Sequence, residues 1–232
     1  MTGLVRKATL LLSVCGLLAA SSALASVPDP GNSSFNKSNL NLVGHDGVSP
    51  DGFSPFTVNV KDLAGNPIQG SIVVVDFSGC SDIQFCEDQL GNSTADCPTH
   101  TVRKTTDVNG DATFQIIGGA LIDTGDPDGG DCNCVVVYAD GVNIVETADE
   151  PMNAGCFDLD NANGIGGGDL SLWLGDFGSG AGPLRADYNH DADCGDQPSA
   201  VGGGDLSIWL GAFGNGGSSD SCAGLSANKC TP

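Results

Sequence analysis

The stretch FTVNVKDLAGNPIQGSIVVVDFSG, residues 56–79, decides the fold of the first half of the chain. At its start Phe56, Val58 and Val60 alternate with polar residues, which is the period-two pattern of a half-buried β-strand. The turn formers DLAGNP follow, and the run IVVVDF is apolar and rich in β-branched side chains. Similar patterns predict strands at 101–106, 112–117, 134–139 and 142–146. Several short strands separated by turns predict a β-sandwich.

The same stretch, together with TTDVNGDATFQIIGG at residues 105–119, resembles the bacterial immunoglobulin-like domains of invasin-type surface proteins. In that family a strand ending in a D-x-x-G-N-P turn leads into a valine-rich strand, and a T-D-x-N-G-x-A-T-F hairpin follows. The resemblance implies a sandwich that serves as a spacer, stalk or adhesive module rather than as an active site.

Two aspartate clusters in this half invite a metal interpretation. Asp107, Asn109 and Asp111 occupy the first oxygen-bearing positions of an EF-hand loop, but the twelfth position is Gly118 instead of an acid. Because Asn-Gly is a strong hairpin signal, a hairpin turn is the preferred interpretation. The loop DTGDPDGGD at 123–131 is open to two interpretations, a weak cation site or a solvated turn.

Residues 1–25 are typical of a secretory signal peptide. Arg6 and Lys7 precede an apolar run from Ala8 to Ala20, and Ala23-Leu24-Ala25 has the small-residue pattern of a cleavage site. No later stretch approaches the ~20 apolar residues that a membrane-spanning helix requires. We therefore expect a secreted protein without a membrane span, located outside the cell or on its surface.

The composition is strongly acidic. The formal net charge is −21, and it becomes −23 when Arg6 and Lys7 are removed with the signal peptide. Such a charge repels nucleic acid and anionic lipid and attracts cations. Nine cysteines remain once Cys15 is removed, and most are expected to pair in an oxidising compartment. Proximity in sequence suggests Cys222–Cys230, Cys80–Cys86 and Cys156–Cys194, and the odd number of cysteines leaves one thiol free or used between chains.

The second half of the chain contains a repeat. GGGDLSLWLGDFG at 166–178 and GGGDLSIWLGAFG at 202–214 differ at two positions, and oxygen-bearing residues alternate before each copy. Calcium takes six to eight oxygen ligands, and a curled twelve-residue loop that ends in an acid supplies them. The sequence therefore predicts two Ca²⁺ loops, each followed by a helix. The predicted ligands are Asp158, Asp160, Gly164 and Asp169 in the first loop and Asp187, Asn189, Asp191 and Asp205 in the second.

Both predicted helices carry an apolar stripe. Leu170, Trp173, Leu174 and Phe177 lie at i, i+3, i+4 and i+7, and the second copy repeats this spacing. Helices of about ten residues are marginal alone in water. We expect the two stripes to pack on each other and both tryptophans to lie in the core.

Residues 156–214 resemble the type I dockerin, a duplicated calcium-binding module. The resemblance implies two loop–helix units related by pseudo-twofold symmetry, without catalytic activity, that dock onto a cohesin module and often tether carbohydrate-active enzymes. This chain departs from the family pattern at three places. Position five of the first loop is Ala162, so Asn161 or Asn163 must supply a ligand there. The second loop has extra residues after Asp191, and paired glycines precede each final acid.

These observations predict two modules, an all-β immunoglobulin-like sandwich followed by a small α-helical dockerin-like module with duplicated EF-hand-like loops. The predicted boundaries are 1–25 for the signal peptide, 26–150 for the sandwich, 151–216 for the calcium-binding repeat pair and 217–232 for a cysteine-containing tail. The expected function is non-catalytic calcium-dependent attachment to a cohesin-like or other surface protein. The alternatives are a self-associating component of a surface layer or matrix, or an accessory subunit of a polysaccharide-degrading complex.

Overall fold

A computed structural model describes residues 26–36, 39–42, 55–121, 134–144, 152–162, 164–179, 186–189, 201–215, 222 and 228–232. The predicted signal peptide and the acidic loop at 123–131 lie outside these residues. Among the helices of the described part, none is long and apolar enough to cross a membrane.

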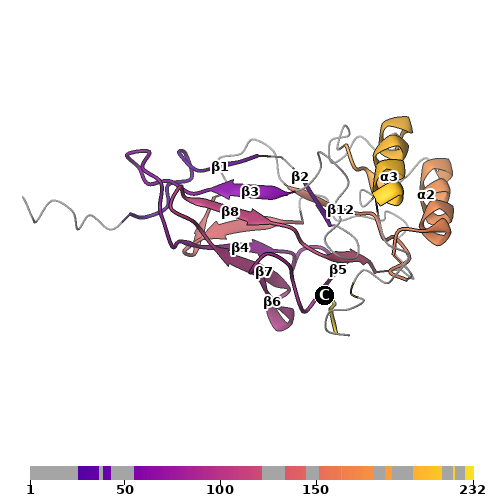
Figure 1. Cartoon of the computed structure of the whole chain (residues 1–232), viewed down its shortest axis with the longest axis horizontal. Helices are drawn as coiled ribbons and strands as arrows, with labels where there is room; N and C mark the ends of the chain where they lie inside the picture. The colour runs from indigo at the N-terminus through magenta and orange to yellow at the C-terminus, as the bar shows by residue number, and fades with distance from the viewer. Residues whose placement is uncertain are drawn as a thin grey trace, which may run out of the picture.

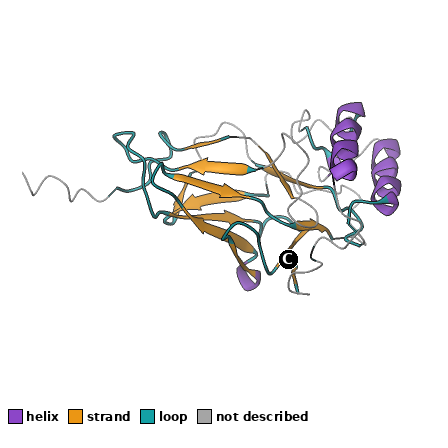
Figure 2. Cartoon of the chain, in the orientation of Figure 1, coloured by secondary structure: helices purple, strands orange, loops and turns teal. Residues whose placement is uncertain are grey.

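Two antiparallel sheets form the larger part of the described chain (Figure 2). The first sheet has the strand order β1 (Ser34–Phe35), β3 (Phe56–Asn59), β8 (Asp111–Phe114). The second has the order β11 (Val142–Asn143), β10 (Val136–Ala139), β4 (Ile72–Asp76), β7 (Thr101–Thr105), β6 (Thr94–Asp96). The strands that the alternating patterns predict correspond to β3, β4, β7, β8, β10 and β11.

The two sheets enclose a common apolar core. Phe56 and Val58 of β3 are buried while their polar neighbours are half-buried, as the period-two pattern requires. Val73 and Val75 of β4 and Val137 of β10 are buried in the same cluster. Burying each such valine stabilises the folded chain by roughly 1.5–3 kcal/mol relative to leaving it exposed.

Tight turns carry the chain from one sheet to the other. The Asp62 carboxylate accepts hydrogen bonds from the backbone N–H groups of Asn66 and Ala64, at 2.8 and 2.9 Å. Asp107 accepts equivalent bonds from Asn109 and Asp111, at 2.8 and 3.0 Å. Backbone hydrogen bonds lower the pKa of both carboxyl groups. Because β7 and β8 belong to different sheets, the turn at Asp107 joins two layers instead of forming the predicted hairpin.

Two smaller sheets lie between this sandwich and the helices (Figure 1). In the first, β2 (Asn39–Leu42) pairs in parallel with β12 (Asn153–Cys156). The second has the order β13 (Lys229–Cys230), β5 (Ile83–Cys86), β9 (Gly118–Ala120), and a 3-10 turn, η3 (Cys97–Thr99), precedes β7. Strands from both halves of the sequence therefore pair with each other.

The predicted division into a sandwich and a separate helical module is wrong. The described residues contain only two short α-helices, α2 (Gly167–Ser179) and α3 (Gly203–Asn215), both at one end of the molecule (Figure 1). Trp173 and Trp209 are buried, as predicted, but they belong to the same core cluster as the sandwich residues. The helices have no core of their own because Leu174 and Phe177, like their copies in α3, are exposed. The predicted module boundaries at residues 150 and 216 lie among residues outside the described part of the chain.

Among the described residues, three disulfides connect distant segments, and none of these matches the pairings that proximity suggested. They are Cys80–Cys134, Cys86–Cys222 and Cys97–Cys230. The last two close loops with sequence separations of 136 and 133 residues, which ties the C-terminal segment to β5 and η3. Cys156 is buried, and Cys194, its suggested partner, lies outside the described residues. Asp191, a predicted ligand of the second loop, also lies outside them. Three disulfides are consistent with a protein of an oxidising, extracellular compartment.

Candidate metal centre

The first predicted loop brings three carboxylates together. Asp158 follows β12, Asp160 lies two residues further on, and Asp169 stands in the first turn of α2. One oxygen of each lies within 4.8 Å of the others. Asp158 and Asp169 are completely buried, whereas Asp160 is half-buried. Three of the four ligands predicted for this loop thus form a compact group that could hold a metal ion.

Backbone hydrogen bonds fix the position of the final acid. Asp169 Oδ1 accepts a bond from the Asp160 N–H at 2.9 Å, and its Oδ2 accepts one from the Gly166 N–H at 2.6 Å. The Ala162 N–H donates to Asp158 at 3.1 Å and to Asp160 at 2.9 Å. The loop therefore curls around its own carboxylates, with the backbone supplying the donors.

The buried final acid of this loop has a raised proton affinity. The pKa of Asp169 is raised to about 6, mainly by burial and to a smaller extent by the negative charges of Asp158 and Asp160, while the two N–H bonds act in the opposite direction. A bound cation would remove this repulsion, because it places positive charge among the three oxygens.

The second loop repeats this arrangement where it is described. Asp205 Oδ1 accepts from the Asn189 N–H at 3.0 Å, and its Oδ2 accepts from the Gly202 N–H at 2.7 Å. These are the bonds that Asp169 makes, from the same loop positions. Asp187 and Asp205 are completely buried and Asn189 is half-buried. Asp191, the remaining predicted ligand, lies outside the described residues.

One glycine of each GGGD segment leaves room for the side chain at loop position three. A Cβ atom at Gly168 would collide with the Asp160 carboxylate, and a Cβ at Gly204 would lie 2.7 Å from the Asn189 amide nitrogen. At Gly167 and Gly203, by contrast, a Cβ would meet no atom within 4 Å. The third glycine therefore leaves the space in which the position-three side chain approaches the final acid.

The middle of the first loop departs from the prediction. Gly164, predicted to offer a backbone carbonyl, is buried and has a positive φ of 64°, a conformation that glycine adopts at no cost. Asn161 was a candidate to replace the ligand missing at Ala162. Its side-chain oxygen instead accepts a hydrogen bond from Lys229 Nζ at 2.8 Å. The other candidate, Asn163, lies outside the described residues.

The first loop contacts strand β9 of a smaller sheet. The Ala120 N–H of β9 donates to the Asp158 carbonyl at 2.8 Å. Gly119 lies so close that a Cβ there would be 2.7 Å from the same carbonyl. Gly119, Ala120 and Lys229 were not predicted as part of the site, because these contacts join segments that are far apart in sequence and no local pattern marks them.

Aromatic residues connect the two loops to each other. Phe157 stacks on Tyr188 with ring centroids 4.6 Å apart, and the Tyr188 hydroxyl donates to the Cys156 carbonyl at 3.0 Å. Burial raises the pKa of Tyr188 well above its usual value, so the hydroxyl stays protonated and keeps this donor role. The Trp209 indole N–H donates to the Phe157 carbonyl at 3.3 Å. The start of the first loop is therefore held by residues of the second.

The described histidine belongs to the core. His100 is 4% exposed, stacks on Phe85 at 4.7 Å, and has Nδ1 2.9 Å from the Phe77 carbonyl oxygen. Burial lowers its pKa. His45 and His190 lie outside the described residues. The described donors of the two loops are oxygen atoms, which suit a hard cation and are unlike the nitrogen and sulfur donors of zinc sites.

Comparison with known proteins finds no matching family model, no matching curated protein and no matching solved structure.

Proposed function

We propose that the chain is a secreted, non-catalytic calcium-binding protein that attaches to an extracellular partner protein through its two loop–helix units. The observation that carries this proposal is the repeated ligand geometry, in which Asp169 and Asp205 accept the same pair of backbone hydrogen bonds. Because the same geometry recurs in both loops, we expect the two loops to have the same function.

Calcium is the cation that suits these loops best. Asp158, Asp160 and Asp169 offer carboxylate oxygens, and Gly164 is the predicted source of a backbone carbonyl oxygen. Asp187, Asn189 and Asp205 are the corresponding donors of the second loop. Bound calcium would supply positive charge that offsets the repulsion among the buried carboxylates, so binding should stabilise the helix end of the molecule.

The exposed faces of the two helices support an attachment role. Their exposed residues are the same in both copies and none of them carries a charge, although the whole chain has a net charge of −21. Leu174, Phe177, Leu210 and Phe213 are 53, 53, 51 and 49% exposed. Large exposed apolar side chains in a neutral setting are a feature of protein interfaces.

The sequence resemblance of the repeats to type I dockerins makes a cohesin module the first partner to test. The proposed attachment would then serve assembly on a surface or, as an accessory role, in a polysaccharide-degrading complex. Self-association into a surface layer would use the same apolar faces.

The calcium part is tested by isothermal titration calorimetry of the full secreted chain. We expect two bound Ca²⁺ ions in the wild type and one in each of the variants Asp169→Asn and Asp205→Asn. Asp107→Asn is the matched control, since Asp107 lies in an exposed turn of the sandwich, and it should keep both ions. A wild type that shows no binding heat and no change in circular dichroism with Ca²⁺ would overturn the proposal.

Sedimentation velocity with and without Ca²⁺ tests the attachment part. A monomer in both conditions that binds a cohesin module only with calcium supports attachment to a separate partner. The double variant Leu174→Lys/Leu210→Lys should abolish that binding while keeping both calcium ions. A calcium-dependent polymer of the pure protein would instead favour self-association.

A further inference from the structure

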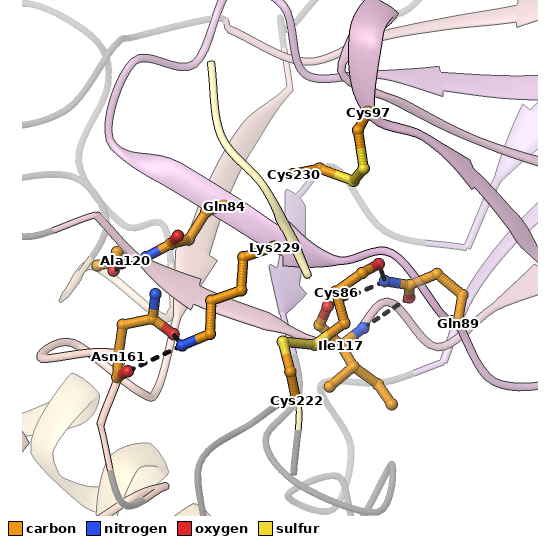
Figure 3. Close-up of a disulfide and its surroundings, with 10 residues drawn as sticks. All are labelled: Gln84, Cys86, Gln89, Cys97, Ile117, Ala120, Asn161, Cys222, Lys229 and Cys230. Carbon is orange, nitrogen blue, oxygen red and sulfur yellow. Dashed lines mark hydrogen bonds between the residues drawn. A yellow bond between two sulfur atoms is a disulfide. The ribbon is translucent and has the colours of Figure 1, made fainter. Parts of the chain in front are cut away.

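The C-terminal strand lies next to the first metal loop and is firmly attached there. Strand β13 pairs with β5, and Cys230 forms a disulfide with Cys97 (Figure 3). The preceding residue adds a further contact, because Asn228 donates to the Glu87 carboxylate at 2.7 Å. The backbone of Lys229 is therefore held in place on both sides.

From this strand the Lys229 side chain extends to Asn161 in the first metal loop (Figure 3). Its ammonium group donates to the Asn161 side-chain oxygen at 2.8 Å and to the Asn161 carbonyl at 3.1 Å. Both residues are half-buried. Hydrogen bonds with a charged donor are stronger than neutral ones, and partial burial reduces their competition with water.

The backbone conformation of Asn161 benefits from such support. Its φ of 51° lies in the left-handed region, which asparagine enters more readily than most residues but less readily than glycine. This conformation turns the chain between Asp160 and Ala162, the segment whose backbone N–H groups bond to the loop carboxylates. A group that holds Asn161 therefore also holds the ligand-bearing turn.

We infer that Lys229 is a positioning residue for the first calcium loop, which it keeps in the ligand-bearing conformation before the cation arrives. The inference rests on the proposed calcium function. A preorganised loop loses less conformational entropy on binding, which raises the affinity without a new ligand. This matters most in the first loop, because Ala162 offers no side-chain ligand at position five.

The positive charge of Lys229 has an opposing effect, since it repels a nearby cation. The ammonium donates to two neutral oxygens of Asn161, which are not among the predicted carboxylate ligands. Two anchored hydrogen bonds outweigh a screened repulsion between partly solvated charges. The two effects predict opposite results when Lys229 is replaced, so experiment can separate them.

The test is a Ca²⁺ titration of the full chain followed by amide NMR. The N–H groups of Gly166 and Gly202 bond to Asp169 and Asp205, so they report on the first and second loop separately. Lys229→Met keeps the length of the side chain and removes its donors. We expect about a tenfold weaker affinity at the Gly166 reporter, because both hydrogen bonds from the ammonium to Asn161 are lost, and no change at Gly202.

Two variants and a metal-free measurement complete the design. Lys229→Arg retains donors for both Asn161 oxygens and should restore the affinity, while Lys61→Met, the same kind of exchange in the sandwich, should leave it unchanged. Without metal, hydrogen exchange at Ala162 and Gly166 should be faster in Lys229→Met than in the wild type.

Equal or tighter calcium binding by Lys229→Met at the Gly166 reporter would overturn the inference and leave the calcium function intact. A wild type in which neither reporter responds to calcium would overturn the proposed function and this inference together.

Discussion

Gly168 and Gly204 decide whether the position-three side chains can reach the final acids of their loops. A Cβ atom at Gly168 would overlap the Asp160 carboxylate, whereas Gly167 has open space. Neighbouring glycines in one GGG run therefore have different roles, and the sequence alone does not distinguish them.

Exchanging these two glycines for alanine should separate their roles. Gly168→Ala should lower the calcium affinity of the first loop by tenfold or more, because Asp160 must move away from Asp169. Gly167→Ala should leave the affinity unchanged and keep or slightly raise stability. Calorimetric titration of both variants measures this. Equal losses would show that the space around Gly168 is not what the loop requires.

Asp169 should make the stability of the calcium-free protein depend on pH. Its pKa is about 6 in the folded chain, above its usual value of 3.8, mainly because it is buried. The folded state therefore binds a proton more tightly than the unfolded state between these values. The free energy of unfolding should consequently fall as the pH rises from about 4 to about 6, and fall no further above that range.

Urea unfolding with a chelator present, at pH 4.5 and pH 7, measures this dependence. Asp169→Asn removes the titrating group, so the difference between wild type and variant isolates its contribution. If the variant keeps the full pH dependence, another group is responsible. With calcium present the trend should reverse, because protons then compete with the cation for Asp169.

At the scale of the elements, helices α2 and α3 bury a narrower stripe than their periodicity predicts. Trp173 and Trp209 are 1% exposed, but the leucine and phenylalanine further along each helix are about half exposed. Phe177 stacks on Trp173 with centroids 5.4 Å apart, and Phe213 repeats this on Trp209 at 5.4 Å. The two apolar stripes were predicted to pack on each other. Instead, each helix places its tryptophan in the core cluster that it shares with the sandwich, and leaves its leucine and phenylalanine exposed.

Both exposed faces contain a glycine that the folded chain does not require. A Cβ at Gly175 or Gly211 would meet no atom within 4 Å, and glycine inside a helix costs up to about 1 kcal/mol relative to alanine. We expect Gly175→Ala and Gly211→Ala each to stabilise the protein by about 0.5–1 kcal/mol in urea unfolding. If a partner approaches these helices closely, the same variants should bind it more weakly. If either alanine variant were less stable than the wild type, this would contradict the open space around Gly175 and Gly211.

At the scale of the whole molecule, one core connects the sandwich and the helices. The buried tryptophans belong to the cluster that contains Val73 and Val75, and β12 pairs with β2 across the predicted module boundary. The disulfides Cys86–Cys222 and Cys97–Cys230 add covalent connections across the same division. The molecule should therefore unfold as one unit.

Thermal unfolding provides the measurement. Fluorescence of Trp173 and Trp209 reports on the helix end, and far-ultraviolet circular dichroism reports mainly on the sheets. We expect both signals to give one coincident transition, which calcium shifts to higher temperature. Two separated transitions, only one of them calcium-sensitive, would indicate independent modules.

Local patterns predicted much of the secondary structure and part of the site. The alternation at Phe56, Val58 and Val60 located a strand, and the spacing of Asp158, Asp160 and Asp169 placed three carboxylates that the structure brings together. Such features were predictable because they depend on neighbours within a dozen residues. The three disulfides and the pairing of β2 with β12 were not predictable, since they depend on how distant segments meet.

The sequence by itself determined the alternating strands, the two helices and the order of oxygen-bearing residues in the loops, because period and spacing act over short stretches of chain. Only the tertiary structure decided that the helices share the sandwich core, that Leu174 and Phe177 stay exposed, and that Lys229 reaches Asn161. The physical reason is that burial depends on which surfaces compete for the same core. The two tryptophans are buried in the core cluster that also contains the sandwich residues, and helices of 13 residues leave too little apolar surface for a second core.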